Sequence, residues 1–162
     1  MKKIIIHTDG GTRGNGKEDS VGGYGIVLEY GDYKKELYKG EKGTTNNIQE
    51  LKGVINALKA LKTTHIPIEL YCDSAYVVNG INQWVAGWKR RGWKKGDGKT
   101  PENLELWKEL DELVGKQKDL KILKIKGHAG HEGNERADEL ANMAMDEIEK
   151  GEVNNGWKRI TN

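Results

Sequence analysis

The chain has 162 residues, and its 27 basic and 25 acidic side chains give a formal net charge of +2 at pH 7. This length predicts one domain, and the apolar runs fall far short of the roughly 18 residues that a bilayer span needs. A single cysteine, Cys72, excludes an intramolecular disulfide and favours a reducing compartment. Since the start of the chain also lacks a signal-peptide core, we expect a cytoplasmic protein with no membrane contact.

The first elements in chain order are predicted to be three antiparallel strands. An isoleucine run over Lys3–Thr8 is typical of a strand buried on both faces, and it ends at Asp9. Residues 23–30 alternate large and small side chains, and Gly31-Asp32 predicts a turn into a strand over 33–39. We therefore expect a meander with Asp9 at the carboxyl end of its first strand.

The middle of the chain changes to helical spacing. Apolar residues recur at i, i+3 and i+4 over Asn46–Lys62, after a Thr45 cap. Residues 66–72 then predict a strand that ends before Asp73. Short helical segments over 74–88 and a helix over Pro101–Val114 are expected to follow.

A last strand over Leu120–Lys126 and a last helix capped by Asn134 complete the pattern. This order indicates an α/β fold with a five-stranded mixed sheet, three antiparallel strands followed by two parallel additions, flanked by helices. We expect a single domain over residues 1–150 and a C-terminal tail of uncertain order over residues 151–162.

Four acidic residues are placed where they could converge. Asp9 and Asp73 follow strands whose carboxyl ends would share one edge of the sheet, where ligands bind in open α/β folds. Helix phase puts Glu50 and Asp138 on the flanks of apolar stripes. Clustered carboxylates repel one another unless a cation lies between them, and hard oxygen ligands select Mg²⁺ or Mn²⁺. The alternative is that each acid is simply solvated.

Positive charge is concentrated over Trp84–Lys99, where six basic side chains and Asp97 give a net charge of +5. Trp84 and Trp88 are four residues apart and can share one helix face beside these cations. Such a surface suits a nucleic acid, because aromatic rings lie along bases and sugars while cations neutralise phosphates. The alternative is that the two tryptophans fill the core.

The chain resembles the ribonuclease H family, specifically its type 1 enzymes, over about residues 3–148. The resemblance lies in the segments Thr8–Gly11, Thr45–Leu51, Asp73–Ser74, Trp84–Lys94, Gly127–His131 and Asn134–Leu140. It implies a ribonuclease H-like fold and an endonuclease that hydrolyses the RNA strand of RNA–DNA hybrids. It further implies a two-metal-ion mechanism that leaves 5′-phosphate and 3′-hydroxyl ends.

The resemblance also implies catalytic roles. The family's metal-binding residues match Asp9, Glu50, Asp73 and Asp138, which would hold two Mg²⁺ ions with Mn²⁺ able to substitute, and Asp9 would bridge both ions. His128 matches the family's mobile-loop histidine, which would shuttle a proton or speed product release. The three other histidines, His7, His65 and His131, are assigned no catalytic role.

The implied substrate contacts divide between the two strands of the hybrid. Asn15, Asn46 and Asn47 match residues that hold the RNA strand, where 2′-hydroxyls distinguish RNA. The residues matched to the DNA strand are Thr45 and Asn103 in a phosphate pocket, Tyr76, Trp84 and Trp88 in a channel, and the cations Lys89, Arg90, Arg91 and Lys94. Thr45 and Asn46 could instead only cap a helix, a role that is compatible with contact. Some relatives carry an arginine two positions before Thr45, where this chain has Gly43.

Two other functions remain open from the sequence. One is a DNA-cutting nuclease of the same fold, such as a resolvase, since fold does not determine substrate. The asparagines and the basic segment with its tryptophans argue against it. The other is a non-catalytic hybrid-binding protein, which the intact set of four acids disfavours. We expect a monomer with no obligate protein partner.

Overall fold

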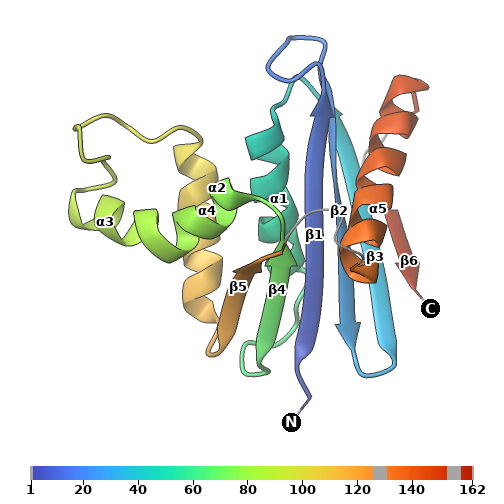
Figure 1. The fold of residues 1–162 in the computed structure, drawn as a ribbon, viewed down its shortest axis with the longest axis horizontal. Coiled ribbons are helices and arrows are strands. Elements are labelled where there is room, and N and C mark those ends of the chain that lie inside the picture. The colour runs from blue at the N-terminus through green and yellow to red at the C-terminus, as the bar shows by residue number, and fades with distance from the viewer. Residues whose placement is uncertain (1, 126–130, 153–157, 162) are drawn as a thin grey trace.

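Six strands form one mixed sheet in the computed structural model, which describes residues 2–125, 131–152 and 158–161 (Figure 1). The strands lie in the order β5-β4-β1-β2-β3-β6. Their bounds are β1 Ile4–Arg13, β2 Val21–Tyr30, β3 Tyr33–Lys42, β4 Ile68–Cys72, β5 Leu120–Lys124 and β6 Lys158–Thr161. The first three strands are antiparallel, and β4 and β5 continue the sheet in parallel from β1. The predicted five-stranded arrangement is confirmed, and β6 pairs antiparallel with β3 as an additional edge strand.

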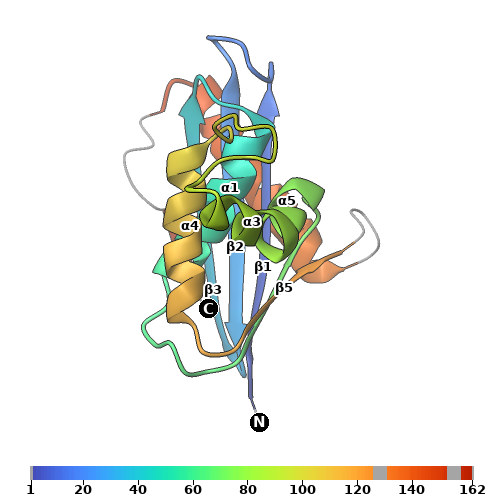
Figure 2. The same ribbon diagram turned by 90° about the vertical axis from the view of Figure 1, so that its left-hand side faces the viewer.

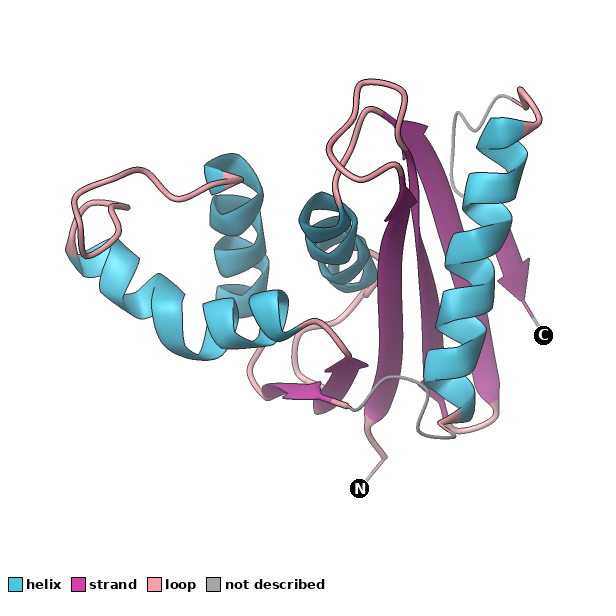
Figure 3. Ribbon diagram, turned by 45° about the horizontal axis from the view of Figure 1, so that its top comes forward, coloured by secondary structure: helices cyan, strands magenta, loops and turns pink. Residues whose placement is uncertain are grey.

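Helices cover both faces of this sheet (Figure 2). Their bounds are α1 Asn46–Lys59, α2 Ala75–Asn79, the π-helical η1 Gly80–Trp84, α3 Val85–Arg90, α4 Leu104–Lys116 and α5 Glu132–Glu149. α1 packs on one face of β1 and β2, with α4 against it, whereas α5 packs on the other face across β1, β2 and β3. Figure 3 shows α2, η1, α3 and α4 grouped at one end of the molecule, opposite α5. Within the described residues, no helix has the length and apolar character needed to span a membrane.

Alternation along the strands divides the core into two layers. Ile6 on β1 and Ile26 on β2 are fully buried together with Leu51 of α1. On the opposite face, Val27 packs with the small and apolar side chains of α5. A Cβ atom on Gly25 would overlap the Ala137 carbonyl oxygen, so the backbone of α5 rests directly on β2.

The end of the first strand differs from the prediction. Asp9 does not end β1, because β2 pairs with β1 as far as Arg13, including an Asp9–Gly25 pair. The parallel ladder with β4, however, stops at the His7–Tyr71 pair. Asp9 therefore lies within a strand but just beyond the point where its neighbour β4 ends.

Helix boundaries also differ from the prediction. α1 ends at Lys59, three residues before the predicted Lys62. α4 starts at Leu104 rather than Pro101, because Asn103 adopts a left-handed conformation with φ 57°. The predicted N-cap of the last helix is wrong: His131 holds that position, and Asn134 is buried within the first turn.

Candidate active site

Three carboxylates converge from three different elements. Asp9 comes from β1, Glu50 from α1, and Asp73 directly follows β4. One carboxylate oxygen from each lies within 4.8 Å of the other two. The register accounts for the pair of aspartates: continuing from His7–Tyr71 by two residues brings Asp9 opposite Asp73. The predicted convergence of these three acids is therefore present.

A glycine brings Glu50 to the sheet. A Cβ atom on Gly10 would lie 2.6 Å from the carbonyl carbon of Gln49 and 2.7 Å from the backbone nitrogen of Glu50. No other residue type allows this approach, so Gly10 lets the second turn of α1 rest on β1. The backbone N–H of Gly10 also donates to Oδ1 of Asp9 at 3.0 Å.

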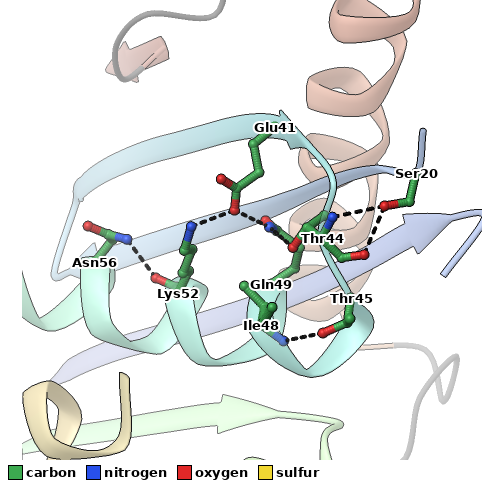
Figure 4. A network of polar contacts seen from close by, with 8 residues as sticks. All are labelled: Ser20, Glu41, Thr44, Thr45, Ile48, Gln49, Lys52 and Asn56. Carbon is green, nitrogen blue, oxygen red and sulfur yellow. Dashed lines mark hydrogen bonds and ion pairs between the residues drawn. The ribbon is translucent and has the colours of Figure 1, made fainter. Parts of the chain in front are cut away.

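A polar network between α1 and β3 also holds the helix in this place (Figure 4). Gln49 is fully buried, and its Nε2 donates to Glu41 Oε1 at 2.6 Å and to Thr44 Oγ1 at 2.8 Å. Lys52 donates to the same Glu41 oxygen at 2.5 Å, and Ser20 Oγ accepts from the backbone of Thr44 at 2.8 Å. This network was not predicted from the sequence. A polar residue at a fully buried helical position next to Glu50 is the signal that could have revealed it.

Asp138 approaches the site from the opposite face of the sheet. It lies on α5, one residue after Ala137, whose carbonyl oxygen faces Gly25. Asp138 is not part of the 4.8 Å group, but its hydrogen bonding and its charge both raise the pKa of Asp9. The fourth predicted acid is therefore an electrostatic neighbour of Asp9 rather than a member of the tight triad.

No basic side chain among the described residues is paired with these four acids. Burial, followed by repulsion from Asp73 and Asp138, raises the pKa of Asp9 to about 8. Burial, followed by the charges of Asp9 and Asp73, raises the pKa of Glu50 well above its ordinary value. A cluster of oxygen ligands that repel one another fits a hard divalent cation.

The asparagines assigned to RNA form a cluster at the start of α1. The backbone N–H of Asn46 donates to Asn15 Oδ1 at 2.8 Å, and Thr12 Oγ1 donates to Asn46 Oδ1 at the same distance. Thr45 caps α1, accepting from the N–H of Ile48 at 3.2 Å, as predicted. Thr12, which was not predicted from the sequence, therefore joins the end of β1 to the start of α1. Asn15 and Asn46 are exposed, and Asn47 is partly buried.

An aromatic groove of about 410 Å³ lies beside α2, η1 and α3. Tyr76, Trp84 and Trp88 line it, with the Trp84 and Trp88 rings 6.0 Å apart. Trp84 is 36% exposed, but Trp88 is only 8% exposed and packs against the buried Trp107, so most of its ring belongs to the core. The Tyr76 hydroxyl accepts from Asn103 Nδ2 at 3.1 Å, which joins the groove to the predicted phosphate pocket.

The predicted cations of α3 and the following loop are exposed. Lys89 forms an ion pair with Asp111 at 3.0 Å, and Arg91 Nε donates to the carbonyl of Lys94 at 3.2 Å. Arg90 makes neither kind of contact among the described residues. We call Lys89, Arg90, Arg91 and Lys94 the basic handle.

Cys72 takes no part in the chemistry of the site. Its side chain is buried, and burial raises the pKa of its thiol to about 12. A thiol that stays protonated at neutral pH is a poor nucleophile, so Cys72 is a packing residue. The predicted catalytic histidine, His128, lies outside the described residues.

The fold and the acidic cluster together define an α/β protein with a carboxylate site suited to divalent cations. The model of the family described as RNase H matches residues 1–146, and the chain belongs to this family. A ribonuclease H of Clostridium botulinum (strain Hall) is 54% identical over 149 residues, which cover 91% of this chain and 99% of that protein.

Solved structures agree with this assignment. LC9-RNase H1, described as a type 1 RNase H with the type 2 active-site motif, superposes with a TM-score of 0.81 at 32% identity, covering 98% of this chain and 77% of the other. LC11-RNase H1, solved in complex with an RNA/DNA hybrid, gives a TM-score of 0.67 at 27% identity, covering 90% of this chain and 99% of the other.

Proposed function

We propose that this chain is a ribonuclease H that hydrolyses the RNA strand of RNA–DNA hybrids as an endonuclease. The observation that carries the proposal is the convergence of Asp9, Glu50 and Asp73 within 4.8 Å, with Asp138 acting on Asp9 from α5. The hybrid bound to the similar LC11-RNase H1 supports the same substrate.

The four acids are suited to hold two Mg²⁺ ions, with Mn²⁺ able to replace them. Asp9 interacts with each of the other three acids, so it would be the central ligand of the set that holds the ions. Bound ions would supply an activated water and stabilise the departing 3′ oxygen, giving 5′-phosphate and 3′-hydroxyl ends. The chain itself contributes the rigid spacing of its ligands, set by the Gly10 approach and the Gln49 network.

The surroundings of the acids suit a hybrid. Asn15, Asn46 and Asn47 offer small polar groups to the 2′-hydroxyls of RNA. Thr45 and Asn103 would hold a phosphate of the DNA strand, and the groove of Tyr76, Trp84 and Trp88 would hold its sugars. The basic handle would lie along the same strand and neutralise its phosphates.

Three finer points belong to this proposal. His128 would assist by moving a proton or speeding product release. The enzyme would act as a monomer of 18.2 kDa without an obligate protein partner. It would act in the cytoplasm, where a lone cysteine stays reduced.

Cleavage assays on end-labelled substrates test the proposal. With Mg²⁺ the chain should cut only the RNA strand of a hybrid, and EDTA should stop the reaction. Asp9→Asn should reduce cleavage to near background, because it removes a bridging charge, while hybrid affinity measured in Ca²⁺ stays within about threefold of wild type.

Matched double-stranded DNA and double-stranded RNA are the controls. Cutting of the DNA duplex would instead identify a DNA nuclease of the same fold. Hybrid binding with no cleavage in either Mg²⁺ or Mn²⁺ would identify a non-catalytic binding protein. Near-wild-type activity of Asp9→Asn would contradict the metal assignment.

A further inference from the structure

The His7 ring is packed between the sheet and the start of α5. It stacks on Tyr71 of β4, with ring centroids 5.3 Å apart and an interplanar angle of 19°. Its Nδ1 atom is buried and has no hydrogen-bond partner among the described residues. The stacking on Tyr71, and a buried nitrogen without a hydrogen bond to the part of the chain that the structure describes, indicate that packing positions this ring.

The other side of the ring meets the backbone of α5. A Cβ atom on Gly133, in the first turn of the helix, would overlap Nδ1 and Cε1 of His7 and lie 2.5 Å from Cγ. Only glycine therefore lets the helix come this close to β1. The second close approach along α5 is at Gly25, which faces the Ala137 carbonyl. These two approaches determine how far the N-terminal half of α5 stands from the sheet.

Asp138 lies next to these contacts. It directly follows Ala137 and is five residues beyond Gly133, about 7.5 Å along the helix axis. His7 is two residues from Asp9 on β1, so both side chains project from the same face of the strand. A displacement of the first turn of α5 away from His7 would therefore change the position of Asp138 relative to Asp9.

We propose that His7 is a positioning residue: its ring, packed between Tyr71 and Gly133, sets the distance of α5 from β1 and thereby holds Asp138 beside Asp9. The inference deepens the proposed function, on which it rests. It concerns the shape of the ring and not its charge, so another flat ring should serve at this position.

Gly133→Ala tests the contact directly. The added methyl group should push the helix away from His7 and lower kcat about tenfold or more, since misplacement by an ångström at a site can cost that much. The KM for the hybrid should stay within about twofold, because the nucleic-acid contacts are elsewhere. The affinity of the substrate-free protein for Mn²⁺, measured by calorimetry, should fall along with kcat. Gly115→Ala is the matched control, a helical glycine with nothing within 4 Å, and should change none of these values.

His7→Ala alone should also lower kcat and Mn²⁺ affinity, since it removes the ring that sets the distance. Combined with Gly133→Ala it should recover part of both, because the methyl group then occupies part of the space that the ring had filled. His7→Phe keeps a flat ring and should retain kcat within about twofold, which a role for the imidazole nitrogens would not allow. Melting curves of each variant verify folding. Wild-type values for Gly133→Ala, or a double variant poorer than either single variant, would overturn the inference.

The two proposals can fail separately. If the wild-type chain bound Mn²⁺ but cut no hybrid, the proposed function would be wrong, and the Mn²⁺ affinities of the same variants would still decide the role of His7. A wild-type chain that bound no Mn²⁺ would overturn both.

Discussion

Asp9 carries a large electrostatic cost in the folded chain. It is 9% exposed and has the carboxylates of Asp73, Glu50 and Asp138 as neighbours. A buried acid among other acids is held protonated unless a cation compensates. The neighbouring carboxylates destabilise the ionised form of Asp9 when no metal is bound, and the same carboxylates make Asp9 an effective ligand for a cation.

The stability of the metal-free protein should therefore depend on pH. The pKa of Asp9 is about 8 in the folded chain and 3.8 ordinarily, so the folded state binds more protons than the unfolded state between these values. The free energy of unfolding should fall as pH rises from 5 to 8, by up to about 1.4 kcal/mol per pH unit. Urea melts in EDTA at several pH values measure this slope.

Asp9→Asn is the control for that measurement, because it removes the titrating group. The slope of wild type minus that of the variant isolates the contribution of Asp9 from those of other acids. If the two slopes were equal between pH 5 and 8, the folded-state pKa of Asp9 would not be raised.

His128→Ala should reduce kcat only in part. General acid–base assistance is worth about 10²–10⁴-fold, and bound ions would still activate the water, so we expect a decrease of about ten- to several-hundredfold. Single-turnover and steady-state rates measured together would separate proton transfer from product release. A decrease as complete as that of Asp9→Asn would contradict the auxiliary role.

At the scale of elements, close backbone approaches at glycines and buried hydrogen bonds determine where the helices lie on the sheet. α1 approaches β1 at Gly10 and is tied to β3 through Gln49 and Glu41. α5 approaches β2 at Gly25. The helices that carry Glu50 and Asp138 are therefore positioned on the sheet by these close contacts.

The basic handle should contribute to binding and not to chemistry. Replacing Lys89, Arg90, Arg91 and Lys94 with alanine should raise the KM for the hybrid far more than it lowers kcat. For every phosphate that a removed cation had neutralised, the slope of log K against log salt should flatten by about 0.9 or less. Lys89 should have the smallest effect of the four, because its ion pair with Asp111 already compensates part of its charge.

Hybrid affinities in Ca²⁺ between 50 and 200 mM salt measure these slopes. The matched control replaces four lysines away from the groove, Lys62, Lys118, Lys121 and Lys150, which are exposed and carry the same total charge. Equal slopes for the handle variant and this control would show that the handle does not contact phosphates.

At the scale of the whole molecule, metal binding and folding are linked, since the four acids come together only in the folded chain. Mg²⁺ at about 100 times its Kd should stabilise the fold by about 2.7 kcal/mol and raise the Tm by about 5–10 °C. Thermal melts with and without Mg²⁺ at constant ionic strength check this shift. Asp9→Asn should abolish most of it, and an unchanged Tm for wild type would contradict a metal site built from these residues.

The sequence alone determined the order and type of the first five strands and of the main helices, because hydrophobic periodicity is a local property of the chain. It also singled out the acids of the site, and the convergence of Asp9, Glu50 and Asp73 is confirmed. The roles assigned to the substrate-contact residues stay predictions.

Other features depended on residues far apart in the chain. Pairing with β2 as far as Arg13 extends β1 beyond Asp9. Pairing with β3 makes residues 158–161 a strand. Trp88 is mostly buried because it packs against Trp107. The packing of His7 against Gly133 brings together β1 and α5, which are distant in the sequence. Local sequence carries no signal for such contacts, because their energy comes from shapes that meet only after the sheet and its helices have assembled.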